Sequence, residues 1–463
     1  MVTASFDRTT VLLALTAVAA ALLLGLVAAV SPPLALAGGI GIAFALVVIA
    51  DASIGLCLFA VVSFLEALPG VGEVSLAKLA GGLLLVSWLA VTAARREHDR
   101  QLLEDHPVIA ACALLFVCWA AASALWAEDS GKALGSAGRF ALNLCLLPIV
   151  YTVVRERKHM LWFAWVFVIG AILSASYGLV VAPGDADAAA EGRLTGSGVD
   201  PNYLATSLVA AFALAVALAS SRRNSGGARM VAIGSGIVLL IAVMLTVSRT
   251  GLAALAMALI AGVALAGPRR RLPLAAIGVV VFAFVPLYFA ALAPTGAVER
   301  ITEVSGGTGR TDIWTIGTRM VEANPVLGVG SGNFPIASIH YLIAPGVLER
   351  DDFIVDTPKV AHNIYLETLA ELGPPGLLLL LAIVGSCIGC AIVAARRFAD
   401  VGDSQLEMLA RAVAVASLAM LTAAFLNSLQ YQKPIWLILS LGPALLAMAT
   451  HEDRMHISRM SRA

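Results

Sequence analysis

Long apolar runs constrain this sequence more than any other feature, because they recur from one end of the chain to the other. We count about 14 of them, near 10–30, 34–50, 54–68, 76–94, 107–126, 137–154, 160–181, 202–220, 230–247, 251–266, 272–293, 373–395, 409–428 and 434–450. A helix of about 18 or more apolar residues is long enough to cross the roughly 30 Å hydrocarbon core of a bilayer. The third and tenth runs are short for that thickness, so about 12 spans form a lower bound.

Composition excludes an ordinary water-soluble domain. Of the 463 residues, 60% are hydrophobic and only 13% are charged, whereas soluble domains carry about 25% charged residues. The chain is therefore expected to form one integral membrane domain over 1–463, an all-α, polytopic transmembrane helical bundle of about 12–14 spans in a lipid bilayer. The net charge of +0 gives no reason to expect nucleic acid as a partner.

Basic residues orient the predicted bundle. With the N-terminus inside, the inner segments hold 19 of the 30 Lys and Arg residues: Arg8, Arg95, Arg96, Arg100, Arg155, Arg157, Lys158, Arg222, Arg223, Arg229, Arg269, Arg270, Arg271, Arg396, Arg397, Arg411, Arg454, Arg459 and Arg462. The short outer loops carry mainly acids. Cytoplasmic loops are enriched in Lys and Arg, so this pattern predicts a prokaryotic inner-membrane protein with both termini in the cytoplasm.

A long connection at 294–374 is the one region with enough polar residues to fold on the membrane surface, and it is placed outside. Apolar residues at helical spacing predict a helix over 312–323, which Asn324-Pro325 ends. A second helix is expected to open at Thr357-Pro358, to include His362 in its first turn, and to end at the Gly373-Pro374-Pro375 sequence before the next span.

Three side chains on the outer side have chemistry suited to a reaction. Arg249 lies in a tight turn between two apolar runs, and Arg310 follows a Gly-rich stretch before the predicted helix. A guanidinium at such a place fits a phosphate group, although it could also reach lipid phosphates or solvent. A histidine in the first turn of a helix has a lowered pKa, because the helix dipole disfavours the cation, so a neutral His362 could act as a base. Its alternative role is capping or packing.

Metal and cofactor motifs are weak. Cys387 and Cys390 form a CxxC pair inside an apolar run with no second pair, which favours inert cysteines. Asp185 and Asp187 resemble the DxD used for metal–diphosphate binding, but in an Ala-rich loop. The glycines at 328–332 follow no predicted strand, so a nucleotide loop is rejected. No metal site and no cofactor are predicted.

Several motifs together resemble the O-antigen ligase and O-antigen polymerase superfamily. The main motif runs from His362-Asn363 through Gly373-Pro374-Pro375-Gly376. The supporting motifs are Ser248-Arg249-Thr250-Gly251, Gly309-Arg310 with Trp314 after it, Asn324-Pro325 followed by Gly328-Val329-Gly330, and Asp200-Pro201-Asn202. The specific resemblance covers 195–385, which is expected to be the catalytic region.

The resemblance implies a GT-C-like membrane glycosyltransferase that needs no metal. Such an enzyme moves a glycan from an undecaprenyl-diphosphate carrier to an acceptor hydroxyl at the outer face of the inner membrane, with inversion. The acceptor is lipid A–core for ligases and another carrier-linked glycan for polymerases, and the sequence leaves this choice open. The resemblance implies that the catalytic residues are Arg249, Arg310 and His362. It implies that the substrate-binding residues are Asn202, Trp314, Asn363, Tyr365 and Glu367.

A transporter or flippase for polysaccharide or lipid-linked oligosaccharide is the alternative from another functional class. It would need polar residues near mid-membrane, and often a repeat of two halves. Few charges lie deep in the apolar runs and no repeat is visible. The sequence therefore favours the enzyme.

Overall fold

The structure is a computed structural model, and it describes residues 31–65, 75–94, 101–180, 193–196, 200–221, 223–291, 310–342 and 359–460, together with Gly25, Ala28 and Ala29. It is 84% helical, with no strand among these residues. Ten of the described helices are long and apolar enough to cross a membrane, and three shorter apolar helices lie at Gly38–Ala50, Ala52–Val62 and Arg249–Ala264. The predicted all-α polytopic bundle is confirmed.

The helices follow the apolar runs of the sequence. They are α2 (Pro32–Ala50), α3 (Ala52–Val62), α4 (Leu76–Ala94), α5 (Leu102–Asp105), α6 (Pro107–Ala122), α7 (Ser130–Leu144), α8 (Leu146–Val153), α9 (Arg157–Val180), α11 (Pro201–Ser220), α12 (Gly226–Leu245), α13 (Arg249–Ala264), α14 (Pro268–Ala291), α16 (Arg310–Ala323), α17 (Phe334–Ala337), α18 (Ile364–Asp400), α19 (Ser404–Ala424) and α20 (Lys433–Met460), with 3-10 turns at Ser123–Leu125 and Ser338–Tyr341. The two runs that looked short are α3 and α13, with 11 and 16 residues. Most of the first run, 10–30, lies outside the described residues.

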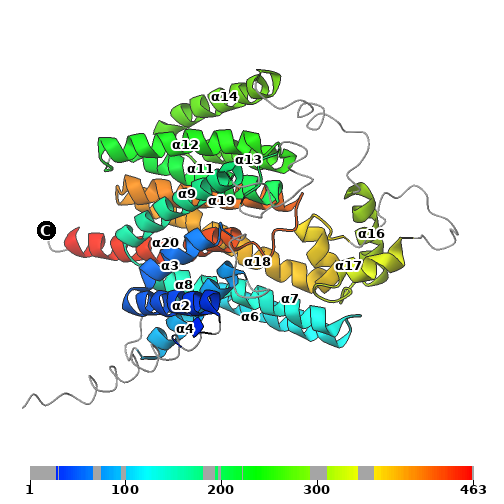
Figure 1. Ribbon diagram of the computed structural model, residues 1–463. Coiled ribbons are helices and arrows are strands. Elements are labelled where there is room, and N and C mark those ends of the chain that lie inside the picture. The colour runs from blue at the N-terminus through cyan, green and yellow to red at the C-terminus, as the bar shows by residue number, and fades with distance from the viewer. Residues whose placement is uncertain are drawn as a thin grey trace, which may run out of the picture.

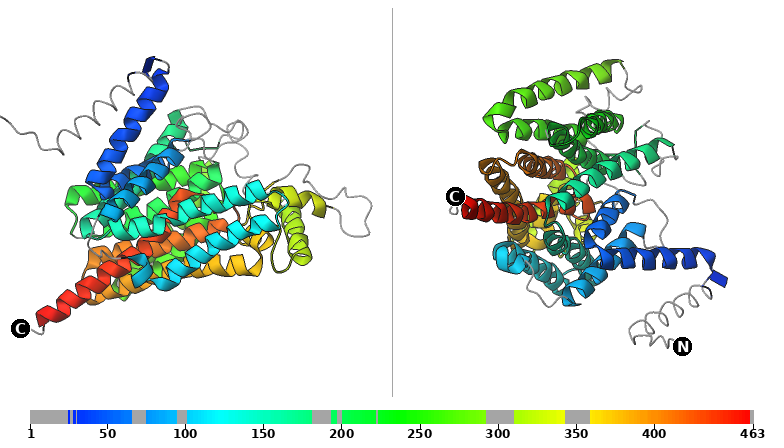
Figure 2. Two further views of the ribbon diagram at one scale, coloured as in Figure 1. Left: turned by 90° about the horizontal axis from the view of Figure 1, so that it is seen from below. Right: turned by 90° about the vertical axis from the view of Figure 1, so that its left-hand side faces the viewer.

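Burial separates a central group of helices from a peripheral one. In α11 and α20, 78% of the membrane window is buried, whereas in α14 the share is 11%. Figures 1 and 2 show α14 and α2 at opposite margins of the bundle, with α18, α19 and α20 between them. Small residues allow the central helices to approach closely: a Cβ on Gly442 would lie 2.1 Å from the carbonyl oxygen of Cys387. The peripheral helices expose apolar side chains, as lipid-facing helices do.

Helix α18 breaks where the sequence predicts a helix end. Gly373 has φ 64° and ψ −174°, and the two prolines after it carry no N–H. Consequently the carbonyls of Ala370 and Glu371 lose their donors four residues ahead. The backbone N–H groups of Val329 and Gly330 replace them, at 2.9 and 2.8 Å. A loop of the long connection is thereby fastened to the start of a membrane helix.

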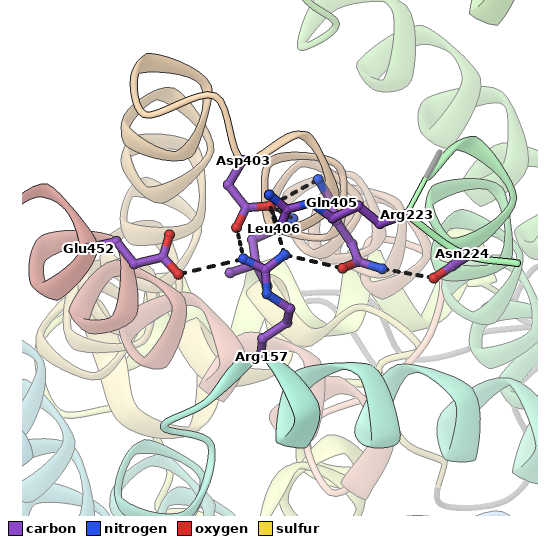
Figure 3. Close-up of polar contacts among 7 residues, drawn as sticks. All are labelled: Arg157, Arg223, Asn224, Asp403, Gln405, Leu406 and Glu452. Atoms are coloured by element: carbon purple, nitrogen blue, oxygen red, sulfur yellow. Dashed lines mark hydrogen bonds and ion pairs between the residues drawn. The ribbon is translucent and has the colours of Figure 1, made fainter. Parts of the chain in front are cut away.

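The two ends of the bundle differ in chemistry. Helices α16 and α17 lie beyond one end, and α20 ends at the other (Figure 1). At the α20 end a polar network, the Asp403 cluster, joins four parts of the chain (Figure 3): Arg157, Arg223, Asn224, Asp403, Gln405 and Glu452. The Asp403 carboxylate caps α19, forms an ion pair with Arg157, and lies 3.5 Å from Arg223. These contacts fix the starts of α9 and α19 relative to each other.

Candidate active site

Four helices begin in one region at the α16 end of the bundle. Asp200 caps α11 and Asn363 caps α18, and Arg310 is the first residue of α16. Ser248 caps α13, and its hydroxyl also donates to Asn202 Oδ1 at 2.7 Å, which ties the start of α13 to the first turn of α11. Helix N-termini carry unsatisfied N–H groups and a partial positive charge. Their convergence suits an anionic ligand.

Arg249 occupies the first position of α13, at the end of the predicted tight turn. Only Thr246, Val247 and Ser248 separate α12 from α13, and Val247 has φ 47°. The Arg193 guanidinium holds this turn, since its Nε donates to Thr246 O at 3.0 Å. The residues of this turn are buried, whereas the Arg249 side chain that follows them is exposed. The arginine is presented at a fixed point of the surface, next to a helix N-terminus.

His362 precedes α18, so its expected place in the first turn of a helix was wrong. Residues 359–363 are not helical, and His362 has φ 49°, a left-handed conformation that few non-glycine residues adopt. The reason is that Asn363 is the better cap, because its side-chain oxygen accepts from the N–H groups of Tyr365 and Leu366 at 3.0 and 3.1 Å. The proposed start at Thr357-Pro358 lies outside the described residues.

Contacts on both sides of His362 hold it in this conformation. The Trp314 indole N–H donates to Ala361 O at 3.0 Å, so α16 fixes the preceding residue. Asn363 fixes the following one. The imidazole Nδ1 is buried and has no hydrogen-bond partner within the described part of the chain. Residues in uncommon backbone conformations cluster at functional sites, which makes His362 a candidate for chemistry.

The surroundings of His362 favour the neutral imidazole. Burial lowers the pKa of His362 below its usual 6.5, and the Arg310 guanidinium lowers the same pKa further. Asp200 acts in the opposite direction, and Lys359 adds to the lowering. Near pH 7 the ring can therefore accept a proton, as a general base must. The same electrostatic coupling places Arg310 and the start of α11 close to the histidine.

The predicted substrate-binding side chains have internal partners. Asn202 accepts from Ser248, Trp314 donates to Ala361, and Asn363 caps α18. Tyr365 and Glu367 are also engaged: the Tyr365 hydroxyl donates to Leu421 O at 2.9 Å, and the buried Glu367 carboxylate accepts from Ser428 and Gln430. These bonds hold the region around His362, and direct binding by these five residues stays a prediction.

Glu371 is a residue that the predicted site did not include. Its buried carboxylate accepts from the backbone N–H of Gly332 at 2.8 Å and of Phe334 at 3.0 Å. In the same loop, Gly328 has φ 70°, and a Cβ there would lie 2.4 Å from the Glu371 carbonyl carbon. The glycines at 328–332 therefore allow a loop to pack on the backbone of α18. An acid four residues after Glu367 was the available signal in the sequence.

An apolar groove begins one helical turn below Arg249. It has a volume of about 530 Å³ and lies between α13 and α14, where Leu252, Leu255, Leu259, Phe282 and Phe289 line it. Its walls are almost entirely apolar. A ligand with an anionic head near Arg249 could place an aliphatic tail in this groove.

Some predicted features fall outside the described residues, among them Asp185, Asp187 and the Gly-rich stretch at 306–309. Among the residues that the structure does describe, no group of three His, Cys, Asp or Glu side chains could hold a metal ion. The two catalytic candidates Arg310 and His362 come together. Arg249 reaches the same region through the bond between Ser248 and Asn202.

Part of the chain is similar to a known protein family. Residues 234–381 match the family model described as O-Antigen ligase. The matched segment contains Arg249, Arg310 and His362 and the helices that position them, and it ends eight residues after Gly373. No curated protein matches the chain.

Proposed function

We propose, from the match of residues 234–381 to the O-antigen ligase family model, that the chain is a glycosyltransferase-type enzyme. It transfers a glycan from an undecaprenyl-diphosphate carrier to an acceptor hydroxyl and needs no metal. The observation that carries the proposal is that Arg310 and Asp200, at the starts of α16 and α11, lie close enough to His362 to shift its pKa. The bond from Ser248 to Asn202 joins the start of α13, and with it Arg249, to the start of α11. Arginine side chains would supply positive charge without a metal ion, and His362 would supply a base in the same region.

The leaving group is the reason that the site needs positive charge. A lipid diphosphate departs as an anion, so the transition state is stabilised by donors and cations that are already in place. Arginine suits this task because its planar guanidinium binds phosphate oxygens in a bidentate manner and stays charged. We assign the diphosphate to Arg249, Arg310 and the N-terminal N–H groups beside them, and the carrier tail to the groove between α13 and α14.

The acceptor hydroxyl requires a base. In the proposed step the neutral imidazole of His362 takes the hydroxyl proton while the oxygen attacks the anomeric carbon. The bond from that carbon to the diphosphate breaks, and the diphosphate leaves with the electron pair. A single direct displacement inverts the anomeric configuration. Asn202, Trp314, Asn363, Tyr365 and Glu367 make internal hydrogen bonds that support the region around the histidine, and we propose that they also bind substrate.

The sidedness of the reaction follows from charge. The chain is a multi-pass membrane protein, and arginines gather at the end away from α16. Because such residues are enriched on the cytoplasmic side, we propose that both termini are cytoplasmic and that the site and the 294–374 connection face the periplasm or the cell exterior. The donor is then used at the outer face of the inner membrane.

A reconstituted transfer assay tests the proposal. Purified protein is mixed with an undecaprenyl-diphosphate glycan, with or without a lipid A–core acceptor, in the presence of EDTA. Product on lipid A–core identifies a ligase, a ladder from donor alone identifies a polymerase, and loss of activity in EDTA contradicts the metal-free mechanism. Movement of the donor across the vesicle membrane without transfer would support the flippase alternative.

Variants test the individual roles. Arg249→Ala, Arg310→Ala and His362→Ala should each abolish transfer while the protein still inserts into the membrane. His340→Ala is the matched control, because His340 is exposed and contacts Glu128 at 3.1 Å. A fully active His362→Ala protein would rule out the base assignment.

A further inference from the structure

A second basic site lies at the opposite end of the bundle, between the α13–α14 turn and helices α18 and α19. A polar cavity of about 220 Å³ is lined there by Arg271 at the start of α14, Arg396 of α18 and Arg411 of α19. We call it the basic cavity. Three guanidiniums from three separate helices reach one space, and the cavity wall between them includes Gly267.

The basic cavity has more positive than negative charge. Glu407 is the carboxylate beside it, and it contacts Arg411 at 3.0 Å and Arg270 at 3.4 Å. Within the described part of the chain, the Arg271 guanidinium donates to one backbone oxygen, Ala266 O, at 3.2 Å. For Arg396 there is no ion pair or hydrogen bond with the part of the chain that the structure describes. The basic cavity therefore has a net positive charge, which an anionic ligand could neutralise.

An apolar cavity neighbours the basic one and shares Arg411 with it. Its volume is about 70 Å³, and it lies between α11, α13, α14 and α19, with Phe212, Leu259, Ile277 and Val415 in its walls. Helix α14 forms one side and is largely unburied, so the apolar part opens toward lipid. A ligand that fits both parts has an anionic head and an aliphatic chain.

We propose that this site binds an anionic phospholipid of the leaflet at that end, with the phosphate in the basic cavity and the first part of one acyl chain in the apolar cavity. Basic pockets between transmembrane helices bind anionic headgroups in this way, and arginine pairs well with phosphate. The site is separate from the proposed donor site: Arg249 begins α13, while Ala264 at the other end of the 16-residue helix lines the basic cavity, roughly 22 Å away at 1.5 Å per residue. The inference does not depend on the proposed glycan transfer.

Lipid titration of the purified full-length chain in neutral detergent tests the site. Phosphatidylglycerol should remain bound in native mass spectrometry and raise the thermal midpoint, because a ligand of the folded state stabilises it. Phosphatidylcholine with the same acyl chains should do neither, and nor should inorganic phosphate alone. Equal retention of phosphatidylcholine would overturn the headgroup assignment, and an equal effect of inorganic phosphate would reduce the site to a free-anion site.

Arginine variants locate the effect. Each guanidinium removed should weaken phosphatidylglycerol binding about fivefold, so Arg271→Gln with Arg396→Gln should weaken it by roughly 25-fold. The matched control is Arg229→Gln with Arg269→Gln, which removes the same charge from exposed residues that do not line the cavity. Replacing Arg271 and Arg396 by Lys should retain most of the binding and shows that the fold tolerates change there. Undiminished binding in the Gln variant would refute the proposal.

Discussion

Gly373→Ala should destabilise the protein strongly, because two separate costs meet at this position. The residue has φ 64° and ψ −174°, a conformation that is almost restricted to glycine and costs other residues about 1–3 kcal/mol. A Cβ would also lie 2.0 Å from the carbonyl oxygen of Val326, which is backbone and must move, at a further cost of about 1–3 kcal/mol. After subtracting about 0.4–1 kcal/mol for the less flexible unfolded chain, we expect a net loss of about 1–5.6 kcal/mol.

The matched control for this variant is Gly389→Ala in the same helix. A Cβ there would have no atom within 4 Å, and its backbone is helical, so alanine should be neutral or should stabilise by about 0.5–1 kcal/mol. Thermal unfolding in detergent, followed by tryptophan fluorescence, compares the two proteins. Transfer activity should also fall in Gly373→Ala, since the loop that packs on α18 must move. Equal midpoints for the two variants would show that neither the backbone conformation nor the contact with Val326 carries the predicted cost.

The remaining predictions concern His362. The pKa of His362 is lowered below 6.5, so activity should fall only as the pH drops through that lowered value. Asp200→Asn keeps a helix cap but removes the charge that raises this pKa, so the loss of activity should move to lower pH. Lys359→Gln removes a charge that lowers the pKa, so the loss of activity should move to higher pH. Shifts of the same sign in both variants would contradict the electrostatic reasoning. Trp314→Phe removes the bond to Ala361 O, worth about 0.5–1.5 kcal/mol, so kcat should fall roughly 2- to 12-fold with KM unchanged if the tryptophan positions His362. A rise in KM at constant kcat would instead indicate that Trp314 binds substrate directly.

The membrane fold could be predicted from the sequence because its cause is local. Each apolar run is long enough to satisfy its own backbone hydrogen bonds as a helix, so the runs and the helices coincide. The end of the first part of α18 was also predictable, since Pro374 and Pro375 cannot donate and Gly373 permits the turn. The packing order could not be predicted, because no pattern in one apolar helix indicates which neighbour it meets.

The candidate residues of the site could be proposed from the sequence, but their geometry could not. Residue pattern and family resemblance indicated Arg249, Arg310 and His362. The backbone of His362 depends instead on Trp314, 47 residues before Ala361 in sequence, and no local signal reports such a contact. The role of Glu371 likewise depends on Gly332, 39 residues away. The features that could not be predicted depend on contacts between residues that are far apart in the sequence.

The Asp403 cluster also has a consequence for biosynthesis. Arg157 begins α9, but its partner Asp403 follows 246 residues later in the chain. A ribosome makes the two in that order, so most of the helices are inserted before the ion pair can form. Until α19 and α20 arrive, the early helices hold a cation without this partner at the membrane boundary. Assembly of the bundle therefore finishes with its last helices, and a nascent chain stopped before residue 403 lacks the contacts that join α9 to the C-terminal half.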